Sequence, residues 1–224
     1  MTPRVAIIAG LPREVAALVR GWAMHREAHD RGIFIWSCAD AMVVAAGMGE
    51  TRATLAVREA MAMGPVSQLV SVGLAGACDP AVAVGTVLEA GSVLEVRTGE
   101  RFATAIGDGP LLVTGPSIAG VREKARLFET YRAAAVDMEA ATVGRLAMAN
   151  GIAFRAIKAI SDDYAFELGS LGKFETKHGH FHTRAFALHT AVRPHTWGNA
   201  IRLGRHSKLA LEMLTARVKL ELRA

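Results

Sequence analysis

The chain has 224 residues, of which 51% are apolar and 6% aromatic, and its formal net charge is +5 at pH 7. That length suits one domain with a full hydrophobic core, so we expect a single domain over residues 1–224. No stretch of the sequence approaches the roughly 18 consecutive apolar residues that a membrane span needs, so we expect none. A strand-like run near the N-terminus, without a signal-peptide layout, predicts a cytoplasmic protein.

The positive charge is concentrated near the C-terminus, where residues 172–224 hold ten Lys or Arg and three Glu. Such a region can bind nucleic acid, bind an acidic membrane surface, or form a solvated helix. No aromatic-rich nucleic-acid motif accompanies it, so we favour the solvated helix and expect no nucleic-acid partner. Contact with a membrane surface or a lipid-linked substrate stays open. Cys38 and Cys78 have apolar neighbours in the sequence, which predicts buried free thiols rather than a disulfide or a zinc site.

The predicted elements alternate along the chain between short apolar strands and helices. We expect strands at residues 5–9, 33–37, 42–46, 68–72, 84–90, 93–96, 111–113, 133–136 and 154–160. Helices are expected at residues 12–20, 51–63, 117–128, 139–150 and 197–222. Pro12 suits a first helical turn, and Gly151 suits a helix end. The last helix should pack through Ile201, Leu211, Leu214 and Val218 and show its basic residues to water.

This interleaving predicts an α/β fold with helices on both faces of a central sheet. Ligands in such folds gather at the carboxyl ends of the strands. Five segments follow apolar strands and are therefore candidates for a site: residues 10–14, 47–49, 73–76, 136–139 and 161–162.

Each candidate segment alone has an ordinary structural explanation. Glu14 could cap a helix, because a carboxylate is stabilised at a helix N-terminus. Gly47-Met48-Gly49 and Gly73-Leu74-Ala75-Gly76 could be plain turns, and neither is a dinucleotide or triphosphate motif. The 136–139 segment could be a capped helix, although a carboxylate there could also bind sugar hydroxyls.

Asp162 could lie in a solvated loop. A carboxyl group beside a buried strand can also keep its proton near neutral pH and act as a general acid. His178, His180 and His182 alternate and could bind a metal, but no acidic residue or Cys accompanies them, so a surface strand or loop is favoured. We expect neither a metal nor a cofactor.

The order of these segments resembles the nucleoside phosphorylase and nucleosidase superfamily, in particular the methylthioadenosine/adenosylhomocysteine nucleosidases. The resemblance covers residues 5–165, and Met138-Glu139 and Ile160-Ser161-Asp162 are its most specific parts. It implies a three-layer α/β/α fold with a central mixed sheet, and assembly as a homodimer or larger homo-oligomer.

The resemblance also implies residue roles in cleaving a purine from ribose. Asp162 corresponds to the acid that protonates the purine N7, Glu139 to the ribose ligand, and Glu14 to the base that activates water. Further substrate contacts are implied for Met138, Gly47, Gly49, Gly73, Leu74, Ala75, Ile118 and Ser161. These roles are chemically consistent, because an oxocarbenium-like sugar needs anionic neighbours and a departing base needs a proton.

Several departures bear on the substrate. Phosphorylase members hold phosphate with an Arg and a Ser, where this chain has Ser71 and Leu74, and Lys158 replaces a common Arg. The segment over residues 96–110 is also short. Proteins called hopanoid-associated phosphorylases are similarly short and share Gly-x-Ala-Gly-x-x-Asp-Pro, here residues 73–80. Their inferred role is removing adenine from an adenosyl lipid.

Three hypotheses follow from this reading. The first is a nucleosidase that hydrolyses a 5′-substituted adenosine. The second is phosphorolysis, with phosphate in place of water. The third is a nucleoside-binding protein without turnover, against which the joint presence of Glu14, Glu139 and Asp162 argues.

Overall fold

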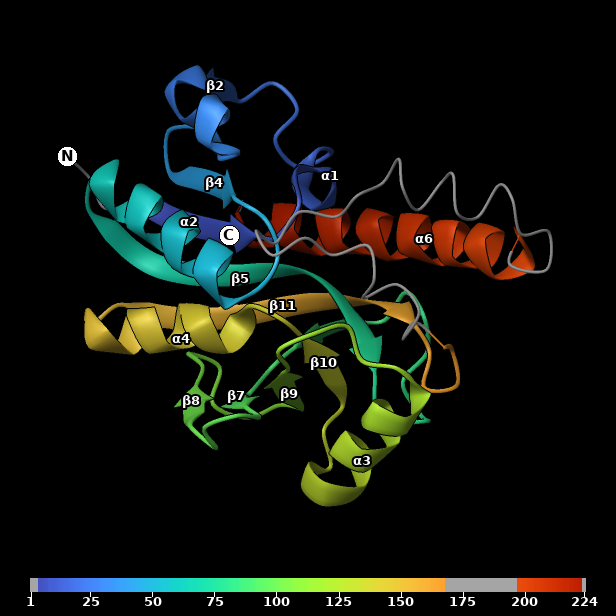
Figure 1. Cartoon of the computed structure of the whole chain (residues 1–224). Coiled ribbons are helices and arrows are strands. Elements are labelled where there is room, and N and C mark those ends of the chain that lie inside the picture. Colours follow the sequence, from blue (N-terminus) through green and yellow to red (C-terminus); the bar gives the residue numbers. More distant parts are fainter. Residues whose placement is uncertain (1–3, 168–196, 223–224) are drawn as a thin grey trace.

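Our computed structural model describes residues 4–167 and 197–222, and it consists of one mixed β-sheet with helices on both faces (Figure 1). The strands are β1 (Arg4–Ala9), β2 (Ala23–His25), β3 (Phe34–Ser37), β4 (Ala41–Ala45), β5 (Val66–Ala77), β6 (Val87–Glu89), β7 (Ser92–Glu95), β8 (Arg101–Ala103), β9 (Leu111–Thr114), β10 (Ala135–Asp137) and β11 (Ala153–Asp162). The helices are α1 (Pro12–Val15), the 3-10 helix η1 (Arg26–Arg31), α2 (Glu50–Ala62), α3 (Val121–Tyr131), α4 (Ala140–Ala149) and α6 (Trp197–Glu221).

Strand β5 organises the sheet, whose main path runs β2-β3-β4-β1-β5-β10-β9-β7-β8. The first part of β5 pairs in parallel with β1, and its end pairs antiparallel with β10. Along most of its length β5 also pairs in parallel with β11, which in turn pairs with β6. The expected mixed α/β/α sheet is thus present, and the ends of β1, β4 and β11 lie on the same side of it.

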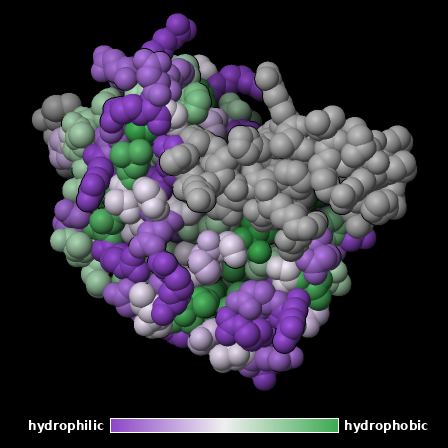
Figure 2. Space-filling view, viewed as in Figure 1, coloured by the Kyte–Doolittle hydropathy of each residue, from purple (hydrophilic) through white to green (hydrophobic). Residues whose placement is uncertain are grey.

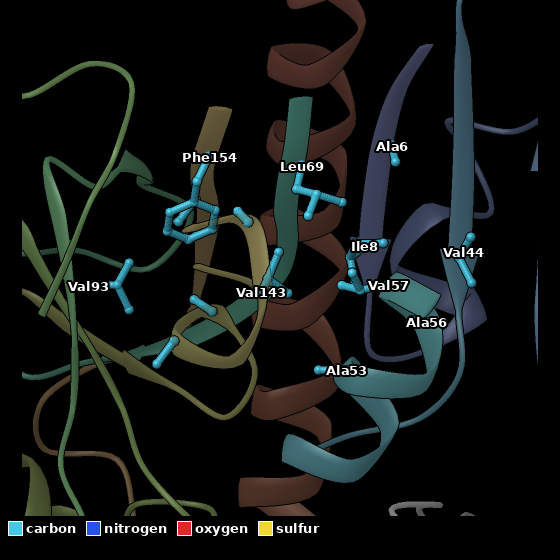
Figure 3. Packing of buried hydrophobic residues seen from close by; sticks show 14 of the residues in the cluster. Ala6, Ile8, Val44, Ala53, Ala56, Val57, Leu69, Val93, Val143 and Phe154 are labelled. Atoms are coloured by element: carbon cyan, nitrogen blue, oxygen red, sulfur yellow. The ribbon is translucent and has the colours of Figure 1, made fainter. Parts of the chain in front are cut away.

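Helices α2 and α4 cover one face of the sheet and bury small side chains against it (Figure 3). Ala53, Ala56 and Val57 of α2 contact a surface that includes Ile8 and Leu69. Alanines let a helix approach a sheet closely, which explains why an Ala-rich chain with few aromatics can still form a dense core. On the molecular surface seen in Figure 2, hydrophilic residues are interleaved with small apolar patches.

Helices α1 and α6 cover the opposite face of the sheet. Ala210, Leu214 and Val218 of α6 pack on strand residues such as Val70 and Ile157. Helix α3 packs in a third cluster, which contains Leu94, Val113 and Val136. On strands β7, β9 and β10 these residues alternate with the residues that belong to the cluster of α4. Because successive strand residues point to opposite faces, α3 lies on the face away from α4.

Several sequence-based boundaries were wrong. The helix expected at 12–20 is only α1, and turns follow it. The strand expected at 68–72 extends to Ala77, so the Gly73–Gly76 stretch is strand and not a turn. Strands β2 and β8 and helix η1 were missed, because each is a short segment without clear periodicity.

Two side-chain expectations were also wrong. Cys38 is exposed, because it lies in the connection between β3 and β4; only Cys78 is buried. Ile201 is 56% exposed and does not pack on the core, whereas Leu214 and Val218 do.

His178, His180 and His182 lie outside the described residues. Within residues 4–167 and 197–222, no helix has the length and apolar character required to cross a membrane.

We predict that Leu214→Ala lowers the free energy of unfolding by about 2–5 kcal/mol, because it leaves a cavity between α6 and the sheet. Leu220→Ala on the same helix is the control; Leu220 is 63% exposed, and its truncation should change stability by no more than about 0.5 kcal/mol. Urea unfolding followed by circular dichroism measures both. Equal losses in the two variants would contradict the packing of α6 described above.

Candidate active site

A cavity of about 610 Å³ lies where β1, β10 and β11 end, beside the second half of β5. Eight residues that the sequence pointed to line it: Glu14, Leu74, Ala75, Ile118, Met138, Glu139, Ser161 and Asp162. Gly47, Gly49 and Gly73 lie outside the lining, although the last two contact residues within it. All five candidate segments therefore contribute to the lining of the cavity, and residues 47–49 do so through Met48 alone.

Glu14 is held at the cavity by two backbone donors from separate parts of the chain. Its carboxylate accepts the N–H of Leu11, the N-cap residue of α1, at 2.9 Å, and the Leu74 N–H at 3.2 Å. The first bond is the helix-capping role foreseen from sequence. The second bond connects α1 to β5, so Glu14 does more than cap a helix.

Gly73 makes room for the Glu14 carboxylate. It has a φ of +146°, and a Cβ built there would lie 3.2 Å from both carboxylate oxygens. An L side chain at this position would therefore be strained twice, by its backbone and by contact with Glu14. The glycine is needed for this close approach rather than for a turn.

Glu139 lies at the N-terminal end of two helices. It precedes α4, and its Oε1 accepts the Gly49 N–H at the start of α2 at 2.8 Å. Burial raises the pKa of Glu139 to about 7 against the opposing effect of the Lys158 ammonium, and the carboxylates of Asp137 and Glu14 add to the rise. A Cβ on Gly10 would touch both Glu14 and Glu139, at 3.4 Å and 3.6 Å, so the two carboxylates flank the same strand end.

Asp137 and Lys158 form a fully buried ion pair behind Glu139, with 2.8 Å between Nζ and Oδ2. Asp137 also accepts the Thr114 hydroxyl at 2.6 Å and the Ala140 N–H at 2.9 Å, so its carboxylate is fully engaged. Burial alone would lower the pKa of Lys158, but the carboxylates of Asp137 and Glu139 raise it above its usual value. This network fixes the loop that carries Met138 and Glu139.

Asp162 ends β11 immediately after an irregularity in the β5–β11 ladder. The register shifts between Ile160 and Asp162, and a bulge of this kind re-aims the following side chain. The Asp162 carboxylate accepts the Ser161 hydroxyl at 2.7 Å on one oxygen and pairs with the buried Lys124 ammonium on the other. Burial raises the pKa of Asp162, although Lys124 and Ser161 oppose the rise.

Sequence reasoning missed Lys124, the Asp137–Lys158 pair and the wall that α6 supplies. Lys124 lies in an Arg-Glu-Lys run typical of a solvated helix, and nothing local distinguishes it from its neighbours. The contribution of α6 comes from a helix that follows β11 by more than 30 residues, and includes Leu203, Ser207 and Leu211.

Two overlapping stretches, residues 4–104 and 90–192, match the sequence profile of the phosphorylase superfamily. The chain belongs to this superfamily. A comparison with curated proteins finds no significant match.

Solved structures with this fold include nucleosidases and a related hydrolase. Futalosine hydrolase of Helicobacter pylori strain 26695 superposes with a TM-score of 0.72 at 12% identity, over 97% of this chain and 96% of that chain. The methylthioadenosine/adenosylhomocysteine nucleosidase of Neisseria meningitidis, in complex with methylthio-immucillin-A, gives 0.69 at 15% identity over 97% of each chain. A Helicobacter pylori nucleosidase mutant with 5′-methylthioadenosine in its active site gives 0.65 at 16% identity, over 87% of this chain and 100% of that chain. At these identities the likeness shows the fold alone.

We predict a pH-dependent effect of Glu139→Gln on thermal stability. The folded protein holds the Glu139 proton more tightly than the unfolded chain, because the pKa is about 7 against 4.5. The stability that this proton contributes is present below pH 4.5 and is lost as the pH rises through about 7. Glu139→Gln does not titrate, so its Tm relative to the parent should rise between pH 5 and pH 8.

Calorimetry at several pH values measures this difference. Glu129→Gln on the exposed face of α3 serves as the control, and its Tm difference should stay constant. A Tm difference for Glu139→Gln that is also constant would show that the folded and unfolded states bind this proton equally.

Proposed function

We propose that this protein hydrolyses the N-glycosidic bond of a 5′-substituted purine nucleoside and releases the free base. The observation that carries the proposal is the arrangement of Glu14, Glu139 and Asp162 around one cavity. Two of these carboxylates flank the end of β1, and the third lies at the end of β11 beside Ser161. Membership of the phosphorylase superfamily supports glycosidic chemistry with nucleosides.

The three carboxyl groups match the charges that develop in the reaction. As the bond breaks, its electron pair moves to the purine and the sugar becomes an oxocarbenium-like cation. Asp162 gives its proton to N7 of the departing base, and Glu139 accepts hydrogen bonds from ribose hydroxyls. Glu14 takes a proton from the attacking water, whose oxygen bonds to the anomeric carbon.

The cavity is large enough to admit a substituent on the 5′ carbon. Its volume of about 610 Å³ lies within the range of about 300–1,000 Å³ that is usual for small-molecule sites. Beyond the carboxylates it extends along α6, where Leu203, Ser207 and Leu211 line it. This wall favours a partly apolar substituent.

Water is favoured over phosphate because the site is acidic and its buried cations are already paired. Lys124 and Lys158 each contact a carboxylate, and the Leu74 N–H donates to Glu14. A phosphate needs several such donors at once. Ser71, which stands where phosphorylases hold phosphate, is fully buried and does not line the cavity.

The homo-oligomer stays a prediction from the resemblance, and the cytoplasmic location stays a prediction from the N-terminal sequence. A binding protein without turnover stays the alternative. The test of turnover is the release of free base from a panel of adenosine, inosine and 5′-substituted nucleosides. No release from any of them would favour the binding protein.

We predict that Asp162→Asn reduces kcat by about 10²–10⁴-fold, because an amide cannot supply the proton to the leaving base. Asp108→Asn is the control, because Asp108 is exposed and does not line the cavity. Base release is followed for both variants after thermal unfolding has shown that they fold. Near-parent turnover in folded Asp162→Asn would remove Asp162 from the acid role.

We predict that product formation is independent of phosphate and that Glu14→Gln abolishes it. Reactions run in phosphate-free buffer and with added phosphate should both yield free sugar, because the acceptor is water. Arg13→Gln tests the alternative, since Arg13 also lines the cavity and could hold an anion. A sugar 1-phosphate product that requires phosphate and Arg13 would make the protein a phosphorylase.

A further inference from the structure

A buried lysine on α3 contacts Asp162, the proposed acid. Helix α3 supplies none of the three carboxyl groups that the proposed reaction uses. Lys124 of α3 and Asp162 of β11 pair with side chains that are 1% and 3% exposed. The Lys124 ammonium also donates to the backbone oxygens of Asp163 at 2.9 Å and Phe166 at 3.2 Å. An ammonium has three N–H donors, and all three are therefore used.

The surroundings are shaped to admit this pair. A Cβ on Gly76 would lie 2.7 Å from Asp162 Oδ2 and 3.0 Å from Lys124 Cε, so only a glycine leaves room for both groups. Ser161 holds the other carboxylate oxygen at 2.7 Å. The Asp162 carboxyl group is thus oriented from two sides at the cavity wall.

Stability alone is a weak explanation for such a pair. Removing two charges from water costs about as much free energy as their attraction returns, and well-packed apolar residues often replace buried pairs without loss. This pair faces a cavity and contains the group proposed to move a proton. Its position points to a role in that step.

We propose that Lys124 is a positioning residue that acts through Asp162 and not on the substrate. This inference rests on the proposed function. When the Asp162 O–H bond breaks and the N7–H bond forms, the carboxyl group becomes a carboxylate in a buried site. The adjacent ammonium stabilises that carboxylate and keeps its own proton throughout. Without the ammonium, burial would make Asp162 hold its proton too tightly to transfer it readily.

Among residues 4–167 and 197–222, few other titratable groups can take this role. The groups that face Asp162 come from α3, the chain after β11 and the end of β5: Lys124, Asp163 and Cys78. Burial raises the pKa of the Cys78 thiol to about 12, so it stays neutral. Asp163 is another acid and opposes ionisation of Asp162. Further along the cavity wall, Glu14, Asp137 and Glu139 are also acidic. Among the other cations, Lys158 is paired with Asp137, Lys208 with Glu212, and Arg13 is exposed.

The test compares Lys124→Met and Lys124→Gln, which are neutral, with Lys124→Arg, which keeps the charge. Arg126→Met is the control, because Arg126 is an exposed cation on the same helix that pairs with Glu123. Activity that needs protonated Asp162 falls as the pH rises through its pKa. A nearby opposite charge lowers a carboxyl pKa by about 1–3 units. The alkaline limb of the kcat profile should therefore move up by about 1–3 pH units in both neutral variants and stay in place in the control.

A second readout separates the acid step from general damage. An N7-methylated purine nucleoside carries its positive charge already and leaves without a proton. The neutral variants should lose about tenfold in kcat on the ordinary nucleoside, less than the roughly 10²–10⁴-fold that the whole acid step supplies because Asp162 itself remains, and little on the methylated one. Lys124→Arg should retain more kcat on the ordinary nucleoside than either neutral variant.

Equal losses on both substrates, or an unshifted alkaline limb, would overturn the inference. Failure of both neutral variants to fold would overturn it too, because Lys124 would then be a structural residue. If the parent protein releases no base from any nucleoside, the proposed function fails before the variants are compared. The two failures are therefore distinguishable.

Discussion

The parallel pairing of β5 with β11 is the constraint on which the site depends. It aligns Gly73 with Lys158 and Gly76 with Asp162, so the two glycines lie beside the charged groups of the neighbouring strand. The same strand brings the Leu74 N–H to Glu14 and turns its end toward β10. A shift of this register by one residue would send every side chain of β11 to the opposite face and separate Asp162 from the cavity.

The charges at the site are balanced in two separate pairs, Lys158 with Asp137 and Lys124 with Asp162. Neither glutamate has a lysine partner of its own in the described residues; Glu14 and Glu139 each rely on backbone N–H donors. Backbone donors hold a carboxylate in place without cancelling its charge. Such a carboxylate can stabilise a cationic sugar, which a carboxylate tied to an ammonium does less well.

Local signals in the sequence predicted a central sheet with helices on both faces and the segments that meet at the cavity, because apolar strands followed by small or acidic residues can be recognised locally. The mixed order of the sheet was implied by the family resemblance. It failed where tertiary contacts decide. The glycines at 73 and 76 suggested a turn, but β5 continues through them because pairing with β11 and β10 satisfies their backbone. Lys124 had no local signal, since its burial is created by residues 38 to 42 positions later in the chain.

Helix α6 shows how far this limit extends. Its heptad-like apolar positions correctly indicated Leu214 and Val218 as core, yet its N-terminal half departs from that pattern, and Ile201 is exposed while Leu203 lines the cavity. Helix α6 is joined to the sheet near its C-terminal end by Arg217, which pairs with Glu89 of β6 at 2.9 Å. One face of α6 is thus anchored on the sheet through Leu214 and Val218, whereas residues between Leu203 and Thr215 on another face form a wall of the cavity. Substitutions on the anchored face should affect stability, whereas those in the cavity wall should affect the choice of substituent on the substrate.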